Sequence, residues 1–196
     1  MDDNTTLPDE VFISVDVETS GPVPGLYALL SIGACVVGQE DKTFYIELCP
    51  PDKALTLPDA VAATGMDIDR LCKEGTAPAI AAAEFASWIR QVSGNTRPVF
   101  TAFNASFDWS FVNDLFVRAG IDNPFGYTAL DMKAFYMGLS GCSWDETRSS
   151  RLPEALQPSP VREHHALDDA VAQAMVFGKM LNYSRSARTY FPNQNI

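Results

Sequence analysis

Two acidic residues with the spacing needed to bind a metal ion follow an apolar segment near the start of the chain. Asp16 and Glu18 lie at the end of the β-rich segment 11–17, which reads VFISVDV. Residues i and i+2 of an extended strand face the same side, so both carboxylates are expected to point at one spot. Two carboxylates this close repel each other unless a cation lies between them. The pair predicts a divalent-metal site, with a solvated strand end as the simpler alternative.

A third acidic residue, Asp108, lies between Phe107 and Trp109 in the segment 104–111, which reads NASFDWSF. Asn104 could simply cap a helix that begins here, and Asp108 would then favour the positive end of the helix dipole. A helix start does not require an acidic residue between two aromatic ones, so the position of Asp108 favours a functional role. The segment alone leaves the structural and the functional interpretation equally open.

The two histidines of the chain are adjacent, at the start of the last predicted helix. His164 and His165 each lie four residues, or one helical turn, before Asp168 and Asp169 respectively. Acidic residues are common in the first turn of a helix, which is the structural alternative. A neutral imidazole beside carboxylates is also what a metal-assisted hydrolase uses as a general base. This segment is therefore the third candidate for chemistry.

A mixed α/β sheet covered by helices is expected to position these segments, because three strands are followed by strands that alternate with helices. Apolar periodicity and chain breakers predict strands at 11–17, 28–37, 43–48, 98–103 and 127–130. They predict helices at 58–64, 76–92, 107–119, 132–139 and 163–181. The segment 140–162 reads as a long functional loop. We expect one domain over residues 1–181 and a polar tail over 182–196.

Composition limits the classes of function. With 196 residues, 46% of them hydrophobic, the chain is expected to form a globular domain. Its net charge of −11 argues against extensive duplex binding, because phosphate neutralisation supplies most of that affinity. Bound divalent cations would still allow the chain to hold a short nucleic-acid end. The acidic N-terminal segment does not resemble a secretory signal, and the apolar run 26–37 is too short to cross a membrane. No two cysteines form a CxxC motif. A cytoplasmic location is therefore expected.

Taken together, the three segments resemble the motifs of the DEDD superfamily of 3'–5' exonucleases. The resemblance is to its histidine subgroup, which includes ribonuclease T and the proofreading subunit of bacterial DNA polymerase III, and it spans roughly residues 11–181. The first motif is D-x-E-T-x-G and the third is H-x-A-x-x-D, and the second lies between them in the sequence. The matching residues are Asp16, Glu18, Thr19 and Gly21; Asn104, Phe107, Asp108 and Phe111; and His164, Ala166 and Asp169.

This resemblance implies an RNase H-like α/β fold, with a five-stranded mixed sheet flanked by helices. It implies two Mg²⁺ or Mn²⁺ ions held by Asp16, Glu18, Asp108 and Asp169. His164 would take a proton from the water that attacks the terminal phosphodiester, and a nucleoside 5'-monophosphate would leave. The expected partners are single-stranded DNA or RNA 3' ends and, because many relatives pair, a second copy of the chain. The expected substrate contacts are Thr19, Ser20, Asn104 and Phe107.

Several alternatives stay open at this point. His165 is the rival general base, because the tyrosine subgroup carries its base four residues before the last aspartate; Ala166 favours His164. A haloacid dehalogenase-type phosphatase would also carry an acidic pair after its first strand, although Glu18 is one methylene too long for that role. A non-catalytic or partner-dependent proofreading module is the third possibility. Further substrate contacts are offered by arginines of the loop and by aromatic residues for which core packing is the alternative role: Arg148, Arg151 and Arg162, with Tyr27, Phe107 and Trp144.

Overall fold

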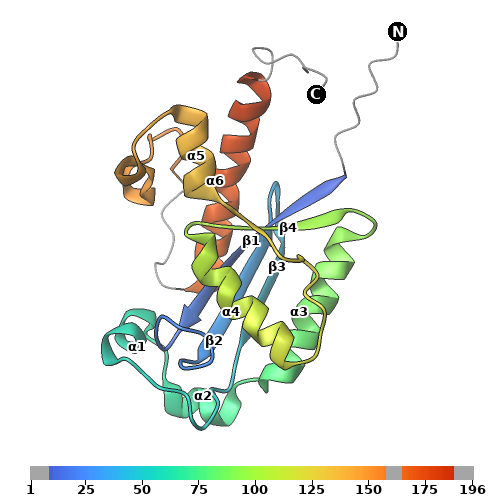
Figure 1. Ribbon diagram of the computed structural model, residues 1–196, viewed down its shortest axis with the longest axis vertical. Coiled ribbons are helices and arrows are strands. Elements are labelled where there is room, and N and C mark those ends of the chain that lie inside the picture. Colours follow the sequence, from blue (N-terminus) through green and yellow to red (C-terminus); the bar gives the residue numbers. More distant parts are fainter. Residues whose placement is uncertain (1–8, 158–164, 188–196) are drawn as a thin grey trace.

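A single five-stranded sheet organises the chain, with strand order β3-β2-β1-β4-β5 (Figure 1). The computed structural model describes residues 9–157 and 165–187. β1 pairs antiparallel with β2, and β2 with β3, whereas β1–β4 and β4–β5 are parallel, so the sheet is mixed as predicted. The strands are β1 Glu10–Thr19, β2 Leu29–Val36, β3 Gln39–Glu47, β4 Arg97–Ala102 and β5 Ala129–Asp131.

Helices cover both faces of this sheet (Figure 1). The aromatic core on one face is closed by α3 (Pro78–Ser93) and α4 (Ala105–Arg118). The other face is covered by α6 (Ala166–Ala187), against which α5 (Met132–Ser140) packs. Two short helices, α1 (Pro58–Thr64) and α2 (Ile68–Glu74), lie between β3 and α3, and two short 3-10 helices follow α5 at Trp144–Thr147 and Ser149–Arg151.

The alternation of side chains along β1 decides which face carries the acidic pair. Val15 and Val17 are buried in the core formed with α3 and α4. Phe12 points the other way, because its ring packs edge-on against Phe177 of α6 at 5.4 Å between centroids. With a period of two, the even-numbered Asp16 must share the face of Phe12. The acidic pair therefore faces the side of the sheet that α6 covers.

Gly33 lets the first turn of α6 lie directly on the sheet. It is the β2 partner of Asp16 in the antiparallel ladder. A Cβ atom added to Gly33 would lie 2.1 Å from the carbonyl carbon and oxygen of Ala166, far inside contact distance. Only a residue without a side chain allows this approach. The close packing brings the start of α6 beside Asp16.

The structure differs from the sequence-based expectation in three places. It has an additional helix, α2, whose single buried residue, Leu71, gives no apolar period to detect. Part of the predicted loop 140–162 forms the two 3-10 helices. The last helix begins at Ala166 and continues to Ala187, six residues past its predicted end. Within 9–157 and 165–187, no helix is long and apolar enough to span a membrane.

Candidate metal and catalytic site

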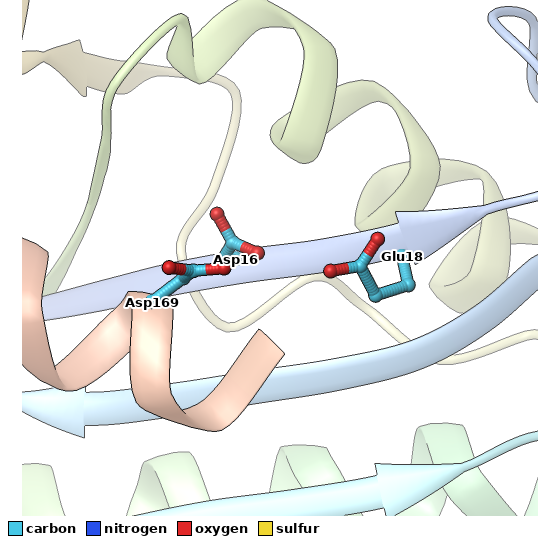
Figure 2. A group of neighbouring side chains, drawn as sticks. All are labelled: Asp16, Glu18 and Asp169. Carbon is cyan, nitrogen blue, oxygen red and sulfur yellow. The ribbon is translucent and has the colours of Figure 1, made fainter. Parts of the chain in front are cut away.

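Three carboxylates from two elements meet at the end of β1 (Figure 2). One carboxylate oxygen from each of Asp16, Glu18 and Asp169 lies within 4.8 Å of the other two. Asp16 and Glu18 extend from β1, and Asp169 comes from the first turn of α6. Oxygens bound to one Mg²⁺ at about 2.1 Å are at most about 4.2 Å apart, so small side-chain rotations would allow this cluster to bind the ion.

Asp108 reaches the same region from the opposite face of the sheet. Pairing between β1 and β4 ends at Ser14, which leaves the backbone of β1 beyond it without a strand partner on that edge. The N–H of Val17 donates to Oδ1 of Asp108 at 3.1 Å, so the carboxylate takes the place of the missing strand. Asp108 is only 5% exposed. It is thus fixed beside the backbone that joins Asp16 to Glu18.

The electrostatics of this cluster favour a cation. Burial raises the pKa of Asp16 well above its ordinary value, and the negative charges of Asp108, Asp169 and Glu18 raise it further. Burial likewise raises the pKa of Asp108 from 3.8 to about 8, although the hydrogen bond from Val17 opposes that rise. Carboxyl groups with such pKa values release their protons readily only when positive charge is near. A divalent cation would supply that charge.

Gln173 and Asp131 support the site, and neither was predicted from the sequence. Gln173 lies one turn after Asp169 on α6 and donates from Nε2 to Oδ1 of Asp16 at 2.7 Å. The two carboxylate oxygens of Asp131 accept from the backbone N–H groups of Ala105 and Ala134, at 2.8 and 2.9 Å. Asp131 therefore holds the first turns of both α4 and α5. The one-turn spacing from Asp169 could have indicated Gln173, and the place of Asp131 directly before the helix predicted at 132–139 could have indicated an N-cap, although not its bond to Ala105.

The described histidine is held by structural contacts. The ring of His165 stacks on Tyr45 of β3, with 4.8 Å between centroids and 27° between planes. Its buried Nδ1 lies 3.3 Å from Oδ2 of Asp168 without forming a hydrogen bond in the described part of the chain. His165 and Glu18 both line a cavity of about 240 Å³ at this end of the sheet. His164, the predicted general base, lies outside the described residues.

Among the predicted substrate contacts, Ser20 has its polar groups engaged within the protein. It is fully buried, and its hydroxyl donates to the carbonyl of Leu55 at 2.7 Å and accepts from the N–H of Ala28 at 2.8 Å. Its own backbone N–H and C=O are also bonded, to Ala28 and Leu57. The prediction that Ser20 contacts substrate is therefore not supported by its placement. Its contacts instead shape the loop that follows β1.

The other predicted contacts differ in exposure. Thr19 is 8% exposed, and its hydroxyl donates to the carbonyl of Gly21 at 2.9 Å. Asn104 is exposed and, with φ of 57°, is the one non-glycine residue with a positive φ in the described ranges. Its side chain accepts from Nζ of Lys133 at 3.0 Å, so it makes no side-chain cap for α4. Phe107 is partly buried, and its ring packs on Phe111 at 5.2 Å.

The loop and aromatic contacts suggested by the sequence are also partly engaged. Arg148 and Arg151 both form ion pairs with Asp145, and Arg162 lies outside the described residues. The ring of Tyr27 packs over Gly21, where a Cβ atom would lie 2.2 Å away. Tyr27 also borders a cavity of about 410 Å³ whose described lining contains none of the four carboxylates. The candidate site is therefore the group of carboxylates at the carboxyl end of β1.

Comparison with known proteins agrees with this geometry. Residues 11–181 match the family described as the 3'-5' exoribonuclease Rv2179c-like domain. The 3'-5' DNA exonuclease Cap18 of Escherichia coli is 46% identical over 169 residues, which cover 86% of this chain and 90% of that protein. Ribonuclease T of Citrobacter koseri is 27% identical over 184 residues, covering 87% and 84%.

Solved structures share the fold at low sequence identity. The nuclease domain of 3'hExo, a DEDDh family member bound to rAMP, superposes with a TM-score of 0.74 at 14% identity, covering 90% of this chain and 94% of that chain. An Escherichia coli ExoI–ssDNA complex with bound zinc gives a TM-score of 0.69 at 21% identity, over 93% of this chain and 42% of that chain. These likenesses confirm the predicted RNase H-like fold, and the family match favours an exonuclease over a haloacid dehalogenase-type phosphatase.

Proposed function

The chain belongs to the Rv2179c-like family of 3'–5' exonucleases in the DEDD superfamily, and on this basis we propose that it removes nucleotides from single-stranded 3' ends by metal-dependent hydrolysis. The observation that carries the metal requirement is the cluster of Asp16, Glu18 and Asp169. Asp108 completes the set from the other face of the sheet. Four carboxylates and two divalent cations balance in charge.

Mg²⁺ or Mn²⁺ is the cofactor proposed for this site. The donor set consists of carboxylate oxygens alone, which hard divalent cations prefer. Two such ions, when bound, would stabilise the attacking and the leaving oxygen of an in-line displacement. Asp16 and Asp108 would bind them as carboxylates, and the hydrogen bonds from Gln173 and Val17 keep one oxygen of each in a fixed direction.

We assign the proton transfer to His164. The ring of His165 stacks on Tyr45, which supports a structural role, and its buried Nδ1 makes no hydrogen bond within the described residues. His164 would accept the proton of the attacking water while the P–O3' bond breaks, so that the products are a nucleoside 5'-monophosphate and a strand shorter by one nucleotide. Thr19, Asn104 and Phe107 stay proposed substrate contacts.

DNA is the first candidate substrate, and RNA is the second. The relative that is 46% identical over most of both chains is a DNA exonuclease, which supports single-stranded DNA ends. The family is described as exoribonuclease, which supports RNA. A homodimer and a cytoplasmic location stay predictions.

Digestion at single-nucleotide resolution tests this proposal. Single-stranded DNA and RNA oligomers, labelled at either end, would be incubated with the protein in Mg²⁺, Mn²⁺ or EDTA. We expect a stepwise ladder from the 3' end that disappears in EDTA, with DNA degraded faster. No cleavage of either polymer by folded protein with both metals would contradict the proposal. Cleavage that starts at the 5' end, or that persists in EDTA, would contradict it as well.

A further inference from the structure

An exposed tryptophan and a lysine lie together beside the α4 end of the site. Nζ of Lys133 sits over the ring of Trp144, 4.3 Å from its centroid. Trp144 is 52% exposed, so a large part of its surface is open to solvent. The exposed part of such an aromatic ring is available for a base to stack on. An ammonium group over such a ring adds a positive charge to an otherwise acidic chain.

This pair is connected to the catalytic residues through Asn104. Lys133 donates to the Asn104 side chain at 3.0 Å, and Asn104 immediately precedes α4, which carries Asp108 in its first turn. Asp131 fixes the first turns of α4 and α5 relative to each other. From Asn104 to Asp108 the helix rises only about 6 Å. The pair therefore lies within a few nucleotides of the carboxylates.

The segment that carries Trp144 has a defined shape and no net charge. Its 3-10 helix begins with a capping box, in which the side chain of Glu146 accepts from the N–H and the hydroxyl of Ser143 at 2.9 and 2.6 Å. Asp145 is paired with both Arg148 and Arg151. Within this segment two basic side chains balance two acidic ones, and Lys133 of α5 adds a cation beside Asp131, whose oxygens accept from the N–H groups of Ala105 and Ala134. The acidic groups here are engaged, so they repel a phosphate less than free carboxylates would.

We propose that Lys133 and Trp144 form a subsite for the strand upstream of the 3' end. A base would stack on the Trp144 ring, and the Lys133 ammonium would pair with a backbone phosphate. Stacking on an aromatic ring tolerates any base, and a single cation next to it follows the backbone, which suits an exonuclease that reads no sequence. This inference rests on the proposed exonuclease function and adds the place where the rest of the substrate is held.

The dependence of KM on substrate length distinguishes a substrate-binding role of Lys133 and Trp144 from a role in packing the 3-10 helix on α5. Steady-state kinetics would compare d(T)₂ with d(T)₁₀, or the matching oligouridylates if RNA is preferred. For Trp144→Ala we expect KM for the decamer to rise about tenfold, and much less for the dimer, which cannot reach the subsite. Trp144→Phe should restore most of the loss because it keeps an aromatic ring. Lys133→Gln should reduce the slope of log KM against log salt by about 0.7.

Tyr127→Ala is the matched control. Tyr127 is 95% exposed and precedes β5, so it lies at the amino end of a strand whose carboxyl end carries Asp131. The Tyr127→Ala variant should have an unchanged KM for both the dimer and the decamer. An unchanged KM for the decamer in Trp144→Ala, or an equal loss on dimer and decamer, would overturn the subsite while the exonuclease assignment stands. Failure of the exonuclease assignment itself would be visible in the unaltered protein, before any variant is compared.

Discussion

Gln173 donates a hydrogen bond to Oδ1 of Asp16 at 2.7 Å, between residues that are 157 positions apart in the chain. Its Oε1 accepts from the backbone N–H of Phe103 at 2.9 Å. One amide group thus joins α6, the end of β1 and the end of β4. It fixes the direction of one Asp16 oxygen and leaves the second oxygen for a cation.

Gln173 is therefore expected to act as a positioning residue. Gln173→Met removes both hydrogen bonds at similar volume, and we expect activity or apparent metal affinity to fall about 10–100-fold. The measurement is the Mn²⁺ concentration that gives half-maximal activity, compared with Gln91→Met on the exposed side of α3. A purely structural role would lower the melting temperature and leave that concentration unchanged.

Asp16→Asn is expected to abolish activity and to stabilise the metal-free fold. Asparagine keeps an oxygen that can accept from Gln173 but carries no charge, so the repulsion among the clustered carboxylates falls. A gain of about 1 kcal/mol would raise the melting temperature by about 2–4 °C. Melts in EDTA would test this, with Asp122→Asn, an exposed residue after α4, as a control for net charge. A lower melting temperature in Asp16→Asn would argue against the cluster.

Without metal, the protein should lose stability as the pH rises. The pKa of Asp108 is raised from 3.8 to about 8 in the folded protein, so the folded state binds this proton more tightly than the unfolded state. The stabilisation is fully present below pH 4 and is lost as the pH rises through about 8, on the order of a few kcal/mol in all. We expect the melting temperature in EDTA to fall between pH 5 and pH 9.

The variant Asp108→Asn separates this effect from the general repulsion of an acidic chain. Asparagine can still accept from Val17, but it does not titrate. Its melting temperature should fall less over the same pH range, and addition of Mg²⁺ should reduce the fall in the unaltered protein. Identical pH profiles for the two proteins would show that Asp108 ionises normally.

Gly33→Ala should disrupt both the fold and the site. The added methyl group would lie 2.1 Å from the backbone of Ala166, and no side-chain rotation can relieve a contact between backbone atoms. We expect a loss of about 3 kcal/mol or more in urea unfolding, together with most of the activity. Gly138→Ala in α5 is the matched control, since nothing lies within 4 Å of its Cβ position. That substitution should be neutral or stabilise by up to about 1 kcal/mol. Similar losses in both variants would contradict the close approach of α6.

His164→Ala should reduce turnover far more than His165→Ala. The second variant loses the stacking on Tyr45, which costs about 1 kcal/mol of stability, but keeps the proposed base. Turnover of a labelled oligomer and a thermal melt of each variant would check both expectations. The reverse order of activity would transfer the role of general base to His165.

Local patterns predicted the parts of the site that depend on neighbours in sequence. The i, i+2 spacing of Asp16 and Glu18 placed both on one face of β1, and the alternation of buried residues decided the face. The bounds of α1 were predicted as observed, because Pro58 and Gly65 frame it. These features follow from periodicity and from residues with restricted or unusual backbone angles.

The contacts of the supporting residues depend on the tertiary structure, so local spacing could indicate these residues but not their partners. Gln173 contacts Asp16 only because α6 docks on the sheet, and Asp131 caps α4 from another strand. Asn104 resembled an ordinary cap, whereas the structure has it in the left-handed region with its side chain on Lys133. Sequence spacing alone cannot show which partner a polar side chain finds across a fold.

The docking of α6 on Gly33 also sets when the site can exist during synthesis. Residues 166–187 leave the ribosome after the strands and helices that they cover, so a nascent chain has Asp16, Glu18 and Asp108 long before it gains Asp169. Until the last helix settles against β2, the three carboxylates of Figure 2 cannot come together. A nascent chain in which α6 has not yet been made therefore lacks the Asp169 carboxylate, one of the four proposed metal ligands.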